Sequence, residues 1–128
     1  MIIDGGLPTV FVSDMDRSIA FYTDVLELKL RERSANVWAL IETRERLIFA
    51  LHPASANGPP SGTVGSITIG FNVTKPLAQV IDKLRQRGVR FHASVKDGPE
   101  AGMQIIFFGD PDGNQFYLCE SKTVETSA

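Results

Sequence analysis

The sequence predicts an α+β fold made of two copies of one βαβββ unit. Signals for a strand, a helix and three further strands occur in that order twice, at a spacing of about sixty residues. A stretch rich in proline, glycine, serine and alanine, residues 53–65, separates the two copies. The second copy ends in two apolar runs joined by a DPDGN turn, a pattern typical of a β-hairpin.

We therefore expect a single domain over residues 1–128. It should consist of a first module over 1–52, a surface linker over 53–65, a second module over 66–120 and a polar, frayed tail over 121–128. A chain of 128 residues is long enough to bury a sizeable core.

Composition excludes several classes of protein. Thirteen basic and fifteen acidic side chains give a net charge of −2, so nothing draws the chain to nucleic acid or to an anionic membrane surface. One cysteine, Cys119, excludes an intrachain disulfide and a cysteine-rich zinc site, and we expect it to be a small buried residue. The N-terminal residues MIIDGG lack the basic and apolar regions of a secretory signal, and no apolar run is long enough to span a membrane. A cytoplasmic location is the expectation.

In the first module, a short strand is predicted at 8–12. A helix should begin at Ser13, because Asp16 follows at the spacing of a capping box. Its apolar stripe is formed by Met15, Ile19, Tyr22 and Leu26. Further strands are expected at 28–32, 37–42 and 47–52, and the charged run 43–46 is expected to be a solvated turn.

In the second module, a strand is predicted at 66–73, followed by a helix capped by Thr74 with Pro76 in its first turn. Gly88 suits the left-handed position that ends such a helix. Its apolar stripe is formed by Leu77, Val80, Ile81 and Leu84. The remaining strands are predicted at 89–95, 103–109 and 115–120.

The DPDGN turn has a simple structural explanation. Pro111 presets its backbone angle, Gly113 tolerates a positive φ, and the aspartates can accept hydrogen bonds from nearby N–H groups. A calcium loop of the EF-hand type is excluded, because the spacing is wrong and the terminal glutamate is missing.

Alternation along the strands separates two faces. Ile67, Ile69, Phe71 and Val73 should lie under a helix, as should Phe49, Leu51, Phe116 and Leu118. The opposite face mixes small, polar and aromatic side chains, which suits a ligand-holding concavity better than a sealed core.

Three segments carry a family resemblance. IIFFGDPDGNQFYL resembles the last hairpin of the vicinal oxygen chelate superfamily, which includes glyoxalase I, bleomycin-resistance proteins, extradiol dioxygenases and fosfomycin-resistance enzymes. VFVSDMDRSIAFYTDVLELKL and ITIGFNVTKPLAQVIDKLRQRGVRF resemble the starts of that superfamily's two modules. The resemblance implies an eight-stranded, cup-like mixed sheet with the helices on its convex face. It also implies a homodimer.

The resemblance also places the superfamily's metal-ligand positions, which fall at Leu7, Ala50, Thr68 and Tyr117. Leucine and alanine have no donor atom, and the hydroxyl groups of threonine and tyrosine are poor ligands beside imidazole and carboxylate. Glu120 lies three residues past Tyr117 and therefore on the other face. We expect no metal site and no cofactor.

Candidate ligand-binding residues follow from the predicted cup face. Tyr117 stands where metal-using relatives keep a carboxylate, and His52 ends a strand on the same face. These two are also the candidates for acid–base catalysis, because histidine exchanges a proton near neutral pH and a phenol can donate one. His92 is expected to have a structural role. The full predicted set is Leu7, Thr9, Phe11, Trp38, Ala50, His52, Thr68, Asn72 and Tyr117.

Three functions remain open at this point. The leading hypothesis is a metal-independent protein that binds and sequesters a small drug or metabolite; bleomycin is disfavoured because the predicted positions carry no carboxylate for a cationic drug. The second is a metal-free lyase, isomerase or cyclase of a secondary-metabolite pathway. The third is a metal-dependent glyoxalase or dioxygenase with a relocated site.

Overall fold

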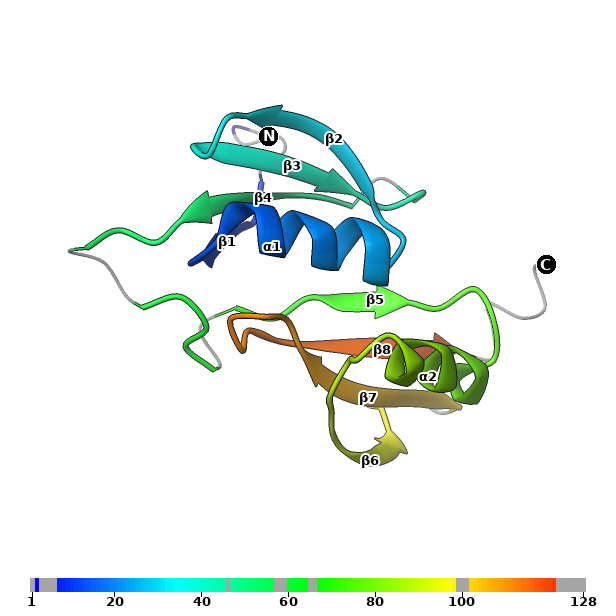
Figure 1. Cartoon of the computed structure of the whole chain (residues 1–128). Coiled ribbons are helices and arrows are strands. Elements are labelled where there is room, and N and C mark those ends of the chain that lie inside the picture. The colour runs from blue at the N-terminus through cyan, green and yellow to red at the C-terminus, as the bar shows by residue number, and fades with distance from the viewer. Residues whose placement is uncertain are drawn as a thin grey trace. The chain divides into compact units, whose positions relative to one another are not determined.

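The computed structural model describes residues 2, 7–45, 47–56, 60–64, 67–98 and 102–121, and it divides into two compact units, Met1–Thr63 and Val64–Ala128 (Figure 1). The first unit contains β1 (Thr9–Val12), α1 (Met15–Ala20), the π-helical turn η1 (Phe21–Val25), β2 (Lys29–Ser34), β3 (Trp38–Glu42) and β4 (Ile48–Pro53). The second contains β5 (Gly70–Asn72), α2 (Leu77–Gln86), β6 (Phe91–Asp97), β7 (Met103–Gly109) and β8 (Gln115–Ser121).

Each unit has the predicted βαβββ order and forms one four-stranded mixed sheet. The strand orders are β1-β4-β3-β2 and β5-β8-β7-β6, and only the first pair in each sheet is parallel. Equivalent backbone bonds join these parallel pairs: Ala50 N–H donates to Pro8 O at 2.9 Å, and Tyr117 N–H donates to Ile69 O at 3.1 Å. The α+β class and the two repeated modules are thus confirmed.

Alternation builds a core on one face of each sheet. In the first unit Val10, Ala39, Ile41, Phe49 and Leu51 are fully buried, as is Tyr22 of η1, whose ring meets Phe49 edge to face at 5.3 Å. In the second unit a cluster of phenylalanine rings serves the same purpose; its members are Phe71, Phe108 and Phe116. We call the opposite side of each sheet, turned away from its core, the helix-free face.

The first helix begins one residue later than predicted. Asp14, not Ser13, is the N-cap, and its Oδ1 accepts the N–H of Arg17 at 3.0 Å. Ser13 instead accepts a bond from the Arg17 guanidinium. Asp16, predicted to complete a capping box, pairs with Arg33 of β2 at 2.6 Å. Aspartate and serine are about equally good N-cap residues, so local sequence preference did not decide between the adjacent Ser13 and Asp14.

Several strand ends also differ from the predictions. β5 is limited to Gly70–Asn72 although a strand was predicted at 66–73, and β6 starts two residues late because Val89 still bonds back to Leu84 of α2. Gly88 has φ +89°, as predicted for the end of this helix. Ser121 completes β8, so the predicted tail begins one residue late. Residues 122–128 of that tail, residues 57–59 and 65 of the linker, and Arg46 of the predicted turn lie outside the described residues.

The second helix is capped from another element. Thr74 does not cap it, because α2 begins at Leu77 after Pro76 and receives no side-chain bond from its own N-cap residue. The N–H of Leu77 donates to Glu120 Oε2 of β8 at 3.1 Å. A carboxylate at this end also interacts favourably with the helix dipole. Glu120 therefore ties α2 to the last strand.

Replacing Glu120 with alanine should lower the free energy of unfolding by about 1 kcal/mol, the usual effect of losing a helix cap. Glu120→Gln keeps an oxygen acceptor and should lose less than half of that amount. Urea titration of both variants measures the difference. Equal losses for the two substitutions would contradict a capping role.

The DPDGN turn is tightly bonded through Asp110, which is 7% exposed. Its Oδ1 accepts the N–H of Asp112 at 3.1 Å and of Asn114 at 2.8 Å, and its Oδ2 accepts the Asn114 amide at 3.0 Å. Gly113 has φ +88°. The predicted hairpin turn is confirmed, and within the described part of the chain no helix is long and apolar enough to cross a membrane.

Candidate functional site

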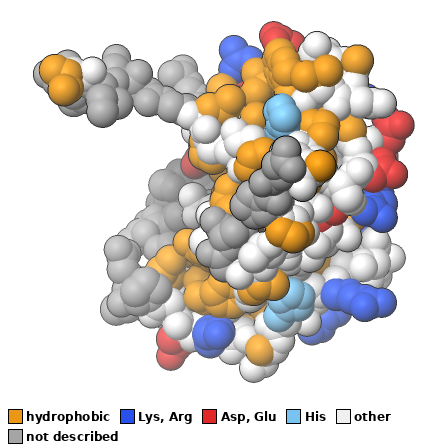
Figure 2. Space-filling model, turned by 90° about the vertical axis from the view of Figure 1, so that its left-hand side faces the viewer, with side chains coloured by type: hydrophobic (Ala, Val, Ile, Leu, Met, Phe, Trp, Pro, Cys, Tyr) orange, Lys and Arg blue, Asp and Glu red, His pale blue; other side chains and the backbone are white. Residues whose placement is uncertain are grey.

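In the first unit, the helix-free face carries six of the predicted site residues; they are Leu7, Thr9, Phe11, Trp38, Ala50 and His52. Leu7 and Phe11 are 48% and 43% exposed, whereas Val10 and Val12 between and after them are buried. Strand register places Thr9 beside Ala50 and Phe11 beside His52, and the Phe11 and His52 rings meet edge to face at 5.9 Å. On the side of the molecule that Figure 2 shows, hydrophobic side chains are exposed at the surface and histidine side chains lie beside some of them.

His52 has a defined orientation. Its Nδ1 lies 2.8 Å from the carbonyl oxygen of Pro53. A carbonyl can only accept, so Nδ1 carries the proton in this bond and Nε2 of the neutral ring keeps its lone pair. The exposed imidazole can therefore accept a hydrogen bond or a proton from a molecule bound at this face.

Charged side chains on the same face were missing from the predicted set. Glu42 is paired in register with Lys29 and with Ile48, and it lies in phase with the half-buried Trp38. Its carboxylate accepts from Arg31 at 3.4 Å and faces Lys29 at 3.8 Å. The predicted site residues carry no carboxylate, but Glu42 places one on the same face. Lys29 and Arg31 neutralise the charge of this carboxylate. Alternation along β3 could have predicted the position of Glu42, because it follows Trp38 by four residues and so lies on the same face of the strand.

On the second sheet, the helix-free face is centred on Tyr117. Register places Tyr117 between Gly70 of β5 and Phe107 of β7, and the Tyr117 and Phe107 ring centroids are 5.6 Å apart. A Cβ atom on Gly70 would overlap the outer end of the phenol ring. The ring therefore lies across β5, in the space that the glycine leaves. Thr68, which lies two residues before Gly70 and outside β5, and Asn72 of β5 are both exposed.

Two cationic or basic residues of β6 join this face. Lys96 Nζ lies 5.0 Å from the centre of the Phe107 ring, and His92 is paired in register with Phe107. His92 is exposed, and its Nε2 would lie 3.4 Å from a Cβ on Gly109. The expectation that His92 has a structural role stays a prediction. Register pairs His92 with Phe107 and Lys96 with Ile105, so both lie on the face of Phe107. The bulge between them, with Ala93 at φ +64°, shifts Lys96 along β7 without changing its face. Alternation along β6 predicts that the two side chains share a face but not which face it is.

The residues at the four metal-ligand positions do not suit a divalent ion. Leu7 and Ala50 offer no donor atom, Thr68 offers an exposed hydroxyl, and the Tyr117 phenol is packed against Gly70. The matching backbone bonds of Ala50 and Tyr117 show that these two positions are equivalent in the two units. Over the described ranges, no three His, Cys, Asp or Glu side chains gather as a metal site.

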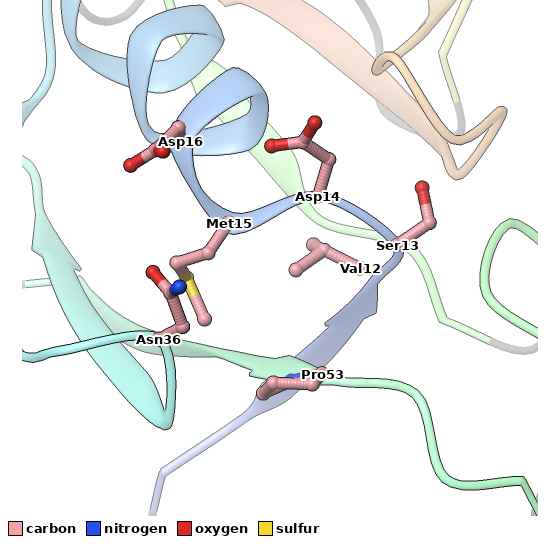
Figure 3. Close-up of a pocket in the computed structure, with 7 residues that line it drawn as sticks. All are labelled: Val12, Ser13, Asp14, Met15, Asp16, Asn36 and Pro53. Atoms are coloured by element: carbon pink, nitrogen blue, oxygen red, sulfur yellow. The ribbon is translucent and has the colours of Figure 1, made fainter.

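A separate cleft of about 390 Å³ lies at the start of α1 and contains none of the predicted site residues (Figure 3). Its two carboxylates are already bonded, Asp14 to the helix backbone and Asp16 to Arg33. Its lining residues are Val12, Ser13, Asp14, Met15, Asp16, Asn36 and Pro53. Cys119 is buried, as expected.

Comparison with known proteins adds a family match. The sequence model of the Glyoxalase/Bleomycin resistance protein/Dioxygenase superfamily matches residues 6–118. A lactoylglutathione lyase from Salmonella typhimurium is 32% identical over 123 residues, covering 87% of both chains. A lactoylglutathione lyase from Escherichia coli O157:H7 is 33% identical over 124 residues, with the same coverage.

Solved structures share the fold at lower identity. TnmS3, an antibiotic binding protein from a Streptomyces species, gives a TM-score of 0.71 at 23% identity, covering 95% of this chain and 99% of its own. The fosfomycin resistance protein FosX from Listeria monocytogenes gives a TM-score of 0.71 at 15% identity, covering 95% of this chain and 96% of its own.

Proposed function

Because this chain belongs to the glyoxalase/bleomycin resistance protein/dioxygenase superfamily, we propose that it is a metal-independent member that binds and sequesters a small drug or metabolite. The observation that carries the proposal is the composition of the two helix-free faces. They offer aromatic surface with a few polar groups, the usual make-up of a small-molecule site, and they lack ligand donors at the superfamily's metal positions. Relatives of the same fold include proteins described as antibiotic-binding and fosfomycin-resistance proteins.

A compound screen followed by Tyr117 variants tests this function. Ligands should raise the melting temperature of the purified protein, since they bind only the folded state. For a ligand found in this way, Tyr117→Phe should weaken binding by about 0.5–1.5 kcal/mol through the loss of one hydrogen bond. Tyr117→Ala should weaken it further through the loss of aromatic contact. If the folded variants bind every hit as tightly as the parent chain, Tyr117 does not belong to the site.

Metal content provides an independent prediction. Protein purified without a chelator should contain less than about 0.1 equivalent of zinc, nickel, iron or manganese, because the donor set cannot hold such an ion. Elemental analysis measures the content, and added EDTA should leave ligand affinity unchanged. A stoichiometric ion whose removal abolishes binding would refute the metal-independent proposal.

The similarity to lactoylglutathione lyases favours one second candidate, a metal-free lyase. In that case His52 would act as base through Nε2 on a substrate held at the helix-free face of the first sheet, or Tyr117 would act as acid on a substrate held at that of the second. Incubation with lactoylglutathione, followed by chromatography of the products, distinguishes catalysis from binding. His52→Gln should lower the turnover number in the first case, and Tyr117→Phe in the second.

The proposal also includes a homodimer and a cytoplasmic location. Each sheet has two edge strands, and two of these four, β2 and β6, are exposed along almost their whole length. Exposed strand edges are commonly covered by a second subunit or protected by charged side chains. β2, with sequence KLRERS, has the charged type of edge.

A further inference from the structure

One row of side chains crosses the whole second sheet on its helix-free face. It runs from Lys96 on β6, over Phe107 on β7, to Tyr117 on β8 and Gly70 on β5. Lys96 Nζ lies 5.0 Å from the Phe107 ring centre, and the two aromatic rings are 5.6 Å apart. The result is a continuous aromatic surface about two rings wide with an ammonium group at one end.

Two glycines lie under rings of this surface, and only Gly70 leaves space that a Cβ would fill. At Gly70 the missing Cβ lets the Tyr117 ring lie across β5, and at Gly109 the imidazole of His92 comes within 3.4 Å of the position that a Cβ would occupy. Both rings therefore lie against the sheet. A flat ligand could stack on such a surface without meeting a projecting side chain at either glycine.

The charge of this face is positive. The described acidic residues of the second unit lie elsewhere: Asp82 is on α2, Asp110 and Asp112 are in the hairpin turn, and Glu120 caps α2. Register pairs Asp97 with Gln104, and Gln104 with Glu120. Asp97 therefore lies on the same face of the sheet as Glu120, opposite to Phe107 and Tyr117. Among the residues that the structure describes, no carboxylate forms an ion pair with Lys96. Its ammonium group contacts the half-buried Phe107 ring, a weak interaction that an anionic ligand group can replace.

We propose that this face selects anionic aromatic compounds, with their rings on Phe107 and Tyr117 and their carboxylate, sulfonate or phenolate on Lys96. This inference rests on the proposed small-molecule binding and adds a ligand class to it. An ammonium group held beside aromatic surface favours a ligand that combines a flat ring with a negative charge. The first sheet differs, because the cations that flank Glu42 there are already paired with it.

Two fluorescent probes that share an aromatic core provide the test. 8-Anilinonaphthalene-1-sulfonate carries a sulfonate, and N-phenyl-1-naphthylamine is the neutral counterpart. The parent chain should bind the sulfonate at least about tenfold more tightly than the amine, and Lys96→Gln should remove most of this preference by weakening only the sulfonate. Phe107→Leu should weaken both probes. Arg85→Gln, which removes a cation of α2 that lies 5.6 Å from the centre of the Phe91 ring, serves as the control and should change neither affinity.

The outcomes separate this inference from the function beneath it. If the parent chain binds both probes equally, or if Lys96→Gln weakens both to the same extent, the ligand class is wrong while small-molecule binding stands. If the parent chain binds neither probe and no compound in the screen, the proposed function fails as well. Circular dichroism spectra of all variants should match the parent spectrum, and raising the salt concentration should weaken the sulfonate alone.

Discussion

Replacing Asp110 with alanine should lower the free energy of unfolding by about 3 kcal/mol, through loss of hydrogen bonds to a nearly buried carboxylate. That carboxylate accepts the N–H groups of Asp112 and Asn114 and the Asn114 side-chain amide. Asn114 is 2% exposed, so its freed N–H would remain buried without this partner. Denaturant titration at neutral pH measures the loss.

Asp110→Asn is the matched control for that substitution. Its amide oxygen can still accept the two backbone N–H groups, but its NH₂ group cannot accept from the Asn114 amide. It should therefore lose roughly a third to a half as much stability as the alanine variant. An alanine variant as stable as the parent would show that Gly113 and the backbone bonds hold the turn without Asp110.

Gly70→Ala should destabilise the protein by about 1–2 kcal/mol, even though alanine usually stabilises an extended strand relative to glycine. The reason is steric, because the added Cβ would overlap the Tyr117 ring and force it off β5. In a Tyr117→Ala background the same change should become neutral or stabilising by about 0.5 kcal/mol. Ligand binding should fall with the displaced ring in the single variant.

The double-mutant cycle of Gly70 and Tyr117 isolates this contact. A coupling free energy above about 1 kcal/mol is expected for two residues in direct contact. Gly109→Ala is the comparison, since a Cβ there would come no closer than 3.4 Å to His92. Additive effects of Gly70→Ala and Tyr117→Ala would mean that the ring does not occupy this space in solution.

The sequence predicted features that depend on periodicity and turn chemistry. Alternation identified the buried face of β8 through Phe116 and Leu118, and the DPDGN turn and the helix-ending Gly88 formed as expected. These signals are local, because each depends on a few neighbouring residues. The same alternation could have identified Phe107 as a residue of the helix-free face, because its two neighbours, Ile106 and Phe108, are buried in the core.

Features that depend on distant residues were missed. Glu120 caps a helix that begins 43 residues before it in the chain, so no local pattern links it to Leu77. The place of Lys96 depends on the bulge in β6, and that of Tyr117 on the glycine of a neighbouring strand. Sequence periodicity specifies which way a side chain points but not what it meets across the sheet.

The two units distribute small and bulky side chains differently over their parallel strand pairs. At equivalent positions, the first unit pairs Thr9 with Ala50, and the second pairs Gly70 with Tyr117. The smaller residue of the pair is on β4 in the first unit and on β5 in the second. In its present orientation the Tyr117 ring fits only because position 70 lacks a Cβ. Positions 70 and 117 therefore act as one unit in protein engineering, and variants that change the side chain at one of them should be designed together with the other.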